Sequence, residues 1–429
     1  MTDFSSDSPF GLYSPWGEFG LDRSTFATHG EITEQVGDIG IKWVQELPPF
    51  LAVDVVPADI HLYSRVGREA GMVPSLIRNP DAVWNFKQEL TRTMTIGVDR
   101  FRYLEVDTEP DGLGGWQNDP EGYVELLRLS HEIVKKVCPN CQILFGGLSG
   151  GQNILDVQGT TFLEKAMAAG AAEFIDGLEF KRHHLSVKDY LLMKKHYDSI
   201  GEILERYGID IRHIPVFLET CMYDGDPNEP VPHPFISNLP VQTETEQATG
   251  LVKTYVYAIS LGITRIFWNL MYERSDFEPG HASPFPQNPF NHYGLINNPT
   301  NADGLSHKKL AYYTYKKMVA ILDGSDWTKV QSIQESDDVC IYKFNKQGKA
   351  VFIAWWDYFN DPAYTPGATR QVVLSDLDGD TARITDAIPD VRSGDLVSDF
   401  STAFKVATMD IHDDMLTLTL GDKPLFIEL

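Results

Sequence analysis

Apolar runs of strand length alternate with amphipathic stretches along roughly the first 320 residues. The runs that predict strands are 11–16, 42–45, 72–77, 101–107, 142–145, 177–180, 216–218 and 265–268. The stretches that predict helices are 25–39, 58–70, 81–95, a segment opening at Asp119, 161–172, a segment opening at Ser186, 243–261 and 306–322. Eight strand–helix units in this order predict a (β/α)8 TIM barrel.

Local signals refine this prediction. Asp119 followed by Pro120 is typical of a helix start, and Ser186 with Asp189 three residues later resembles a capping box. A doubly wound sheet is the rival architecture, but its Gly-rich phosphate loop after the first strand is absent. The glycine pairs at 146–147 and 150–151 are interpreted as a tight turn rather than a phosphate-binding loop.

The pattern changes at Asp326, after which short strands follow one another without helical periodicity. These predicted strands are 339–344, 350–356, 371–374, 382–388, 404–411, 415–420 and 424–429. Such a series predicts a small all-β sandwich. We therefore expect a catalytic barrel over residues 1–325 and a C-terminal β-sandwich over 326–429 that docks rigidly on it.

Charge and cysteine content exclude several classes of protein. With 36 Lys and Arg against 61 Asp and Glu, the net charge is −25, which argues against nucleic-acid and anionic-membrane partners. No apolar run reaches the roughly 20 residues of a membrane span. No signal peptide is visible, which leaves a cytoplasmic protein and the mature form of a secreted one both open. Four cysteines predict no disulfide framework, and Cys138 with Cys141 lacks a second pair for a zinc site.

Candidate chemistry lies at the carboxyl ends of the predicted strands, where barrel enzymes place their active sites. Glu109 follows the fourth strand and Glu219 ends the seventh, so the two carboxylates face each other across the barrel mouth. One protonated and one ionised carboxyl group can cleave a glycosidic bond. Glu105 and Asp107 share strand parity with Glu109, which predicts a polar network around it.

Five passages together resemble a known family. They are LEVDTEPDG, PVFLET, GIKWVQ, NHYGLINNPTNADGLSHKKLAYYTYKKM and LTLGDKPLFIEL, and they span nearly the whole chain. The chain is similar to clan A retaining glycoside hydrolases, especially the β-xylosidase-like family thirty-nine with its C-terminal sandwich. The resemblance implies that Glu109 is the general acid/base, that Glu219 is the nucleophile, and that Trp268 is a sugar platform. It also implies that neither a cofactor nor a metal is needed.

The chain departs from that family at positions expected near the sugar hydroxyls. Thr108 replaces the Asn before the acid/base, and Gln45 replaces an Arg. Lys181 replaces the family's His, with His183 two residues on and on the same face. These departures indicate a divergent subgroup.

Loops at the catalytic face supply further candidates for binding sugars. Prolines and aromatic rings in them suggest stacking surfaces for a glycan. The candidates are Trp116, Tyr223, His233, Phe235, His281, Phe285, Phe290 and His292.

The expected function is hydrolysis of a β-linked oligo- or polysaccharide with retention, and self-association is possible. A metal-dependent barrel hydrolase is one alternative, with ligands drawn from Asp107, Glu179, His183, His184 and Glu219. However, adjacent histidines on a strand point to opposite faces. A catalytically inactive carbohydrate-binding barrel is the other alternative, suggested by Thr108 and Gln45.

Overall fold

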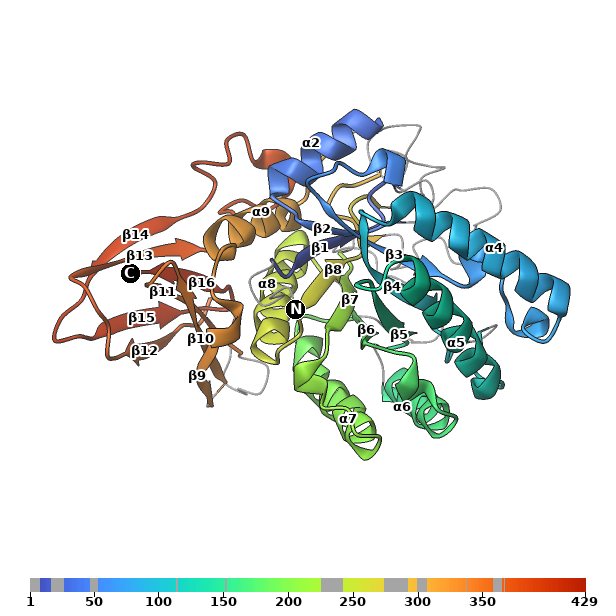
Figure 1. Cartoon of the computed structure of the whole chain (residues 1–429). Coiled ribbons are helices and arrows are strands. Elements are labelled where there is room, and N and C mark those ends of the chain that lie inside the picture. The colour runs from blue at the N-terminus through green and yellow to red at the C-terminus, as the bar shows by residue number, and fades with distance from the viewer. Residues whose placement is uncertain are drawn as a thin grey trace.

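The computed structural model describes residues 8–16, 27–46, 53–112, 115–150, 153–224, 242–273, 292–298, 307–336, 338–357, 365 and 367–429. Within them, eight parallel strands close into a barrel in chain order, and helices surround it (Figure 1). The strands are β1 (Phe10–Tyr13), β2 (Trp43–Gln45), β3 (His61–Val66), β4 (Phe101–Thr108), β5 (Gln142–Leu148), β6 (Gly177–His184), β7 (Val216–Met222) and β8 (Arg265–Trp268). The helices are α2 (His29–Ile39), α4 (Pro80–Gly97), α5 (Pro120–Val137), α6 (Asn153–Ala168), α7 (Met193–Arg206), α8 (Glu244–Ser260) and α9 (Leu310–Leu322). The predicted barrel is confirmed.

Strand alternation sorts the barrel residues into two layers. Along each strand, one set of side chains fills the barrel interior and the other packs against the helices. The interior is largely aromatic and comprises Tyr13, Trp43, Tyr63, Tyr103, Leu144, Phe217, Phe267 and Leu270. These side chains fill the barrel interior. Polar side chains closer to the carboxyl ends of the strands therefore lie at the barrel mouth.

The third strand lies earlier in the chain than predicted. The sequence predicted a helix over 58–70 and a strand over 72–77, whereas β3 is His61–Val66 and Pro74–Leu76 form a 3₁₀ turn. Ser64 and Arg65 hid the strand pattern because they are polar yet buried, and the folded barrel supplies a partner to both. The Ser64 hydroxyl donates to the Glu46 carbonyl at 2.6 Å, and Arg65 pairs with Glu69 at 2.6 Å.

Two helix starts are as the sequence predicted, and a third is not. The Asp119 carboxylate caps α5 by accepting from the Gly122 amide, and Thr243 caps α8. The predicted box at Ser186 forms in part, since the Asp189 carboxylate accepts from the Ser186 amide at 2.9 Å. It does not open the helix, because Asp189 starts a 3₁₀ turn and α7 begins only at Met193 without a side-chain cap.

The glycine pair at 146–147 lies inside β5 rather than in a turn. A Cβ on Gly146 would lie 2.5 Å from the Asp107 carbonyl oxygen and 2.6 Å from that of Val106. The absent side chain therefore allows β5 to approach the end of β4.

The C-terminal region forms two antiparallel sheets, at the left of Figure 1. The six-stranded sheet has the order β14-β13-β16-β11-β10-β9, and β12 pairs with β15 in a second sheet. Their bounds are β9 (Gln331–Ser336), β10 (Val339–Lys346), β11 (Lys349–Trp356), β12 (Arg370–Leu374), β13 (Thr381–Asp386), β14 (Val406–Asp410), β15 (Leu416–Leu420) and β16 (Leu425–Glu428). The predicted sandwich is confirmed, but β9 was missed because this edge strand is polar and exposed.

The six-stranded sheet has two buried faces. Val339 and Ile341 of β10 share a core with the β12–β15 sheet, whereas Tyr342 and Phe344 belong to the core that includes α8 and α9. At this second face, Lys253 of α8 pairs with Asp357 at 3.0 Å, and Tyr190 also donates to Asp357. The proposed division at 325/326 lies in the connection between α9 and β9.

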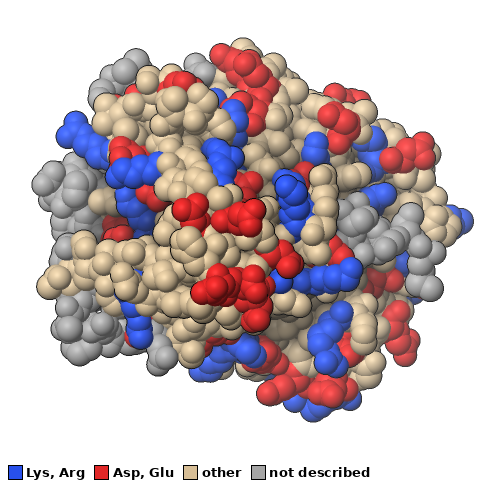
Figure 2. Space-filling model, turned by 90° about the vertical axis from the view of Figure 1, so that its left-hand side faces the viewer, with Lys and Arg blue, Asp and Glu red and all other residues tan. Residues whose placement is uncertain are grey.

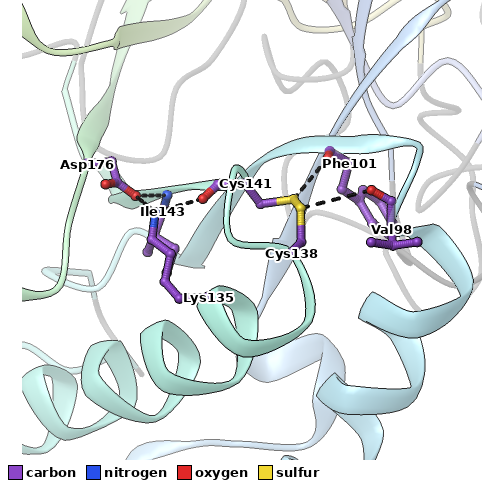
Figure 3. The surroundings of a disulfide bond; sticks show 7 residues. All are labelled: Val98, Phe101, Lys135, Cys138, Cys141, Ile143 and Asp176. Carbon is purple, nitrogen blue, oxygen red and sulfur yellow. Dashed lines mark hydrogen bonds and ion pairs between the residues drawn. A yellow bond between two sulfur atoms is a disulfide. The ribbon is translucent and has the colours of Figure 1, made fainter. Parts of the chain in front are cut away.

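One disulfide joins Cys138, the residue after α5, to Cys141, just before β5 (Figure 3). Beside it, the Lys135 ammonium donates to the Cys141 carbonyl at 2.8 Å and to Asp176 at 2.7 Å. The sequence analysis predicted no disulfide framework from four cysteines and considered this pair only as an incomplete zinc site, so it did not predict the bond. The bond constrains a single helix-to-strand turn.

Acidic and basic side chains are interspersed over the face of the molecule that the C-terminal sheets form (Figure 2). Among the described helices, none is both long and apolar enough to cross a membrane.

Candidate active site

Glu219, near the end of β7, occupies the centre of a cluster of hydrogen-bond donors at the barrel mouth. Its Oε2 accepts from the Lys181 ammonium at 2.7 Å, and its Oε1 accepts from Asn269 Nδ2 at 2.7 Å. His183 Nε2 lies 3.4 Å from the same Oε1. The side chain is 1% exposed, so its charge is solvated by these groups instead of by water.

Glu109 comes directly after β4 and reaches the same place from the opposite side. Its amide donates to the Gly147 carbonyl at 2.9 Å, and its backbone has a positive φ of 44°. Its Oε1 lies 3.8 Å from the Lys181 ammonium. The Glu109 side chain is 45% exposed, so one carboxylate of the site is dry and the other is open to solvent.

Lys181 and Glu219 shift each other's pKa values and so keep each other charged. Burial alone would raise the pKa of Glu219, but the Lys181 ammonium and His183 hold it well below its ordinary value. Burial alone would lower the pKa of Lys181, but the charges of Glu219 and Glu109 raise it well above its ordinary value. Glu219 is therefore ionised and Lys181 is charged at neutral pH.

Two further carboxyl groups lie behind the ion pair. Glu105 accepts from Gln45 Nε2 at 2.8 Å and from the Gly147 amide at 2.7 Å, and Glu179 accepts from the Tyr63 hydroxyl. Burial raises the pKa of Glu105 to about 7 and, together with the charge of Glu105, raises that of Glu179 well above its ordinary value. Glu179 therefore holds a proton at neutral pH, which reduces repulsion within the cluster.

The predicted hydroxyl-binding residues divide into two groups. Lys181 and His183 contact Glu219, as their shared face on β6 predicts. Gln45 is fully buried and supports Glu105 instead of facing the mouth. Thr108 is half-buried, and its Oγ1 has no hydrogen-bond partner among the described residues.

Trp268 does not face the site. Phe267 fills the barrel interior, so alternation turns Trp268 toward the helices, where it is fully buried and its indole donates to the Tyr293 carbonyl at 3.0 Å. The next residue, Asn269, returns to the inward face and contacts Glu219. The prediction of Trp268 as a sugar platform is therefore corrected: Asn269, an amide donor, faces the site instead. The sequence analysis missed Asn269, although strand parity counted from Phe267 would have indicated it.

Trp116 and Tyr223 have no exposed surface either. Trp116 packs on Tyr123 and donates to Asp107 at 2.7 Å, and Tyr223 packs with Tyr293. In the described structure, neither ring therefore has a free face on which a sugar could stack. Five other loop residues that the sequence analysis named as sugar-binding candidates lie outside the described residues: His233, Phe235, His281, Phe285 and Phe290.

His292 belongs to a second buried cluster of charges, where the loops after β7 and β8 start. Its Nδ1 lies 3.7 Å from Glu273 Oε1, and Lys309 donates to Glu273 at 2.7 Å and also to Asp224. These ion pairs hold the stems of two mouth loops together.

Asp107 departs from the predicted network. Its backbone has a positive φ of 60°, which breaks the strand alternation, and its carboxylate meets Trp116 and Arg68. Glu105, one alternation earlier, does join the site. Tyr63 was missed because its strand was predicted as a helix.

Metal ligation has little geometric basis in the described part of the chain. No group of three or more His, Cys, Asp or Glu there is arranged to hold a metal ion. His183 meets Glu219, whereas the neighbouring His184 is buried on the opposite side of the strand.

No protein-family model and no curated protein sequence matches the chain. Solved structures do match it over its whole length. A family 39 glycoside hydrolase from Bacteroides cellulosilyticus WH2 aligns with a TM-score of 0.68 at 16% identity, covering 100% of this chain and 82% of that one. The chain has the fold of this glycoside hydrolase, a (β/α)8 barrel with C-terminal antiparallel sheets.

Two other structures extend this likeness. A 4-O-α-L-rhamnosyl-β-D-glucuronidase from Fusarium oxysporum 12S aligns with a TM-score of 0.61 at 12% identity, covering 99% and 96% of the two chains. A family 51 α-L-arabinofuranosidase from Bifidobacterium longum aligns with a TM-score of 0.57 at 10% identity, covering 99% and 97%. The fold that the sequence resemblance implied is thus confirmed.

Proposed function

We propose that this chain is a retaining glycoside hydrolase that cleaves a β-linked oligo- or polysaccharide, with Glu219 as nucleophile and Glu109 as general acid/base. One observation carries the proposal. A single ammonium, that of Lys181, lies 2.7 Å from Glu219 and 3.8 Å from Glu109, so both carboxyl groups border the same small space.

These two distances also limit how far apart the carboxyl groups are. Taken end to end, they place an oxygen of Glu109 within about 6.5 Å of an oxygen of Glu219, whereas retaining enzymes have about 5–5.5 Å and inverting enzymes about 6.5–9.5 Å. The upper bound lies at the short end of the inverting range. The geometry therefore favours direct attack by Glu219 over attack by an intervening water.

The two environments suit the two roles. Glu219 is dry and kept ionised by donors that fix its orientation, as a nucleophile requires. Glu109 is open to solvent and can reach both the leaving oxygen and the incoming water.

Structural likeness supports the reaction class more than the sugar. The matched structures include the glucuronidase and the arabinofuranosidase, which by their own descriptions act on different sugars. We therefore propose glycoside hydrolysis without naming a monosaccharide.

The test is a panel of aryl β-glycosides assayed with the wild type, Glu219→Ala and Glu109→Ala, each with and without azide. Azide can take the place of a missing carboxylate. We expect Glu219→Ala to be inactive alone and to yield the α-glycosyl azide when azide is added. We expect Glu109→Ala to yield the β-glycosyl azide from substrates with good leaving groups.

Glu202→Ala, at an exposed position on α7, is the matched control and should retain wild-type activity. If Glu219→Ala turned over as fast as this control, the role of Glu219 would be refuted. If the wild type cleaved no glycoside while the same sugars raised its Tm, the chain would be a binding barrel instead.

A further inference from the structure

Among the described residues, Lys181 is the one cationic side chain that contacts both proposed catalytic carboxylates. Its ammonium is bonded to Glu219 at 2.7 Å and lies 3.8 Å from Glu109, beyond hydrogen-bond distance. It therefore has one close partner and a second partner that a small movement would reach.

The proposed reaction moves one negative charge between these two partners. At the start, Glu109 carries a proton and Glu219 is ionised. A Glu219 oxygen then bonds to the anomeric carbon, the glycosidic C–O bond breaks, and the leaving oxygen takes the bonding electron pair and the proton of Glu109. Glu219 is now a neutral ester and Glu109 is a carboxylate.

The second half-reaction returns the charge. Glu109 removes a proton from water, and the water oxygen bonds to the anomeric carbon. The bond between that carbon and Glu219 breaks, and its electron pair returns to Glu219. Lys181 lies beside the negative charge at both stages.

We propose that Lys181 is a positioning residue that exchanges its hydrogen bond on Glu219 for one on Glu109 when the glycosyl-enzyme forms. In this way its positive charge contacts the Glu109 carboxylate while Glu109 acts as the base of the second half-reaction. The inference rests on the proposed function and adds a role that neither the resemblance nor the matched structures assign to Lys181.

The surroundings of Lys181 place its ammonium between the two carboxylates and leave space beside its last carbon. A Cβ on Gly147 of β5 would lie 3.2 Å from Lys181 Cε, closer than ordinary van der Waals contact, so the glycine leaves room for the end of the Lys181 side chain. The ammonium lies 5.8 Å from the centre of the Tyr13 ring. A shift of its last atoms from one carboxylate toward the other needs no movement of β6.

The surroundings also keep Lys181 charged throughout. The titratable groups around it come from β1, β4, β6, β7 and the turn after β4, and they are Tyr13, Glu105, Glu179, His183, Glu219 and Glu109. The carboxylates Glu219, Glu109 and Glu105 all act to raise the pKa of Lys181 against the effect of burial. The ammonium thus remains available after Glu219 has lost its charge.

The first test compares Lys181→Met with Lys181→Arg, using an aryl β-glycoside whose good leaving group makes the second half-reaction rate-limiting. For Lys181→Met we expect a burst of aryl alcohol followed by slow turnover, with kcat lowered roughly tenfold to hundredfold. Azide should restore much of that rate, because azide attacks the glycosyl-enzyme without a base. The acid limb of the kcat profile should move to higher pH, because the base of the second half-reaction has lost the neighbouring positive charge.

Lys181→Arg keeps the charge and should retain most of the wild-type kcat and pH profile. Lys194→Met, at an exposed position on α7, controls for the loss of a lysine elsewhere. A Lys181→Met enzyme without a burst and without a response to azide would overturn the inference.

A second measurement needs no variant. The wild type can be trapped as a glycosyl-enzyme with a 2-deoxy-2-fluoro glycoside and its structure determined. We expect the Lys181 ammonium within hydrogen-bond distance of Glu109, and an ammonium still bonded only to Glu219 would contradict the exchange. Failure of the proposed function would look different, since the wild type itself would then neither turn over nor form an adduct.

Discussion

Glu219 and Glu109 carry the same functional group, yet their surroundings give them different properties. Glu219 is enclosed and bonded to Lys181 and Asn269, whereas nearly half of the Glu109 side chain is exposed. In a low-dielectric site, fixed donors stabilise a charge more than water-exposed ones do. The proposed division of labour thus follows from burial and partners, not from the residue type.

Asn269 is expected to orient Glu219 through its 2.7 Å hydrogen bond. Hydrogen bonds to charged groups contribute about 1.5–3 kcal/mol, so we expect Asn269→Ala to lower kcat/KM by roughly tenfold or more. Steady-state kinetics on the preferred aryl glycoside would measure this. Asn345→Ala, at the exposed end of β10, serves as the control, and equal kinetics for the two variants would rule out the orienting role.

Glu105 is expected to make stability depend on pH. Its pKa is raised from 4.5 to about 7 by burial, so the native state binds this proton more tightly than the unfolded chain does. Stability from this group is therefore present below about pH 4.5 and is lost as pH rises to about 7, by at most ~1.4 kcal/mol per pH unit. The free energy of unfolding of Glu105→Gln, measured by urea at several pH values, should fall less over this window than that of the wild type.

At the scale of the element, alternation explains both the successes and the errors of sequence-based prediction. Apolar runs located seven of the eight barrel strands, and the ends of β4, β6 and β7 led to the charged cluster. β3 was missed because Ser64 and Arg65 carry partners that only the folded barrel supplies. Trp268 was placed on the wrong face because the family pattern was followed instead of the parity of β8. Side-chain contacts across strands, such as that of Gln45 with Glu105, leave no signal in a single sequence.

The close contact of β4 and β5 gives a prediction at this scale. In Gly146→Ala, the new Cβ would press on backbone carbonyls at 2.5 and 2.6 Å, which cannot rotate away. We expect a loss of stability of about 1–3 kcal/mol and lower activity, because the end of β4 leads directly into Glu109. Gly421→Ala has open space around its Cβ and is the control in denaturant unfolding. Equal stability of the two variants would show that β4 and β5 can move apart without a loss in the free energy of unfolding.

At the scale of the whole molecule, the barrel and the C-terminal sheets share a continuous apolar core with a buried ion pair in it. Lys253 and Asp357 are 0% and 5% exposed, and Trp355 donates to the Tyr190 hydroxyl beside them at 2.9 Å. When one charge of such a deeply buried pair is removed, the other is left without a partner, and the folded state is strongly destabilised. We therefore expect the two parts to unfold together.

Removing one partner of this pair tests that expectation. Lys253→Met leaves Asp357 buried without its cation, and we expect a loss of about 3–5 kcal/mol in a single unfolding transition. Lys194→Met breaks an exposed pair on α7 and should cost about 0–1 kcal/mol. Two separate calorimetric transitions in Lys253→Met, only one of them shifted from its wild-type temperature, would argue against a shared core.

The central claim is that Glu219 forms a covalent bond to the sugar. Its most direct test is incubation of the wild type with a 2-deoxy-2-fluoro aryl β-glycoside that matches the preferred substrate, followed by mass spectrometry of the intact and digested protein. The account predicts an added mass of one fluorosugar, located on Glu219. An adduct on another residue, or rapid turnover without any adduct and with an inverted first product, would contradict it.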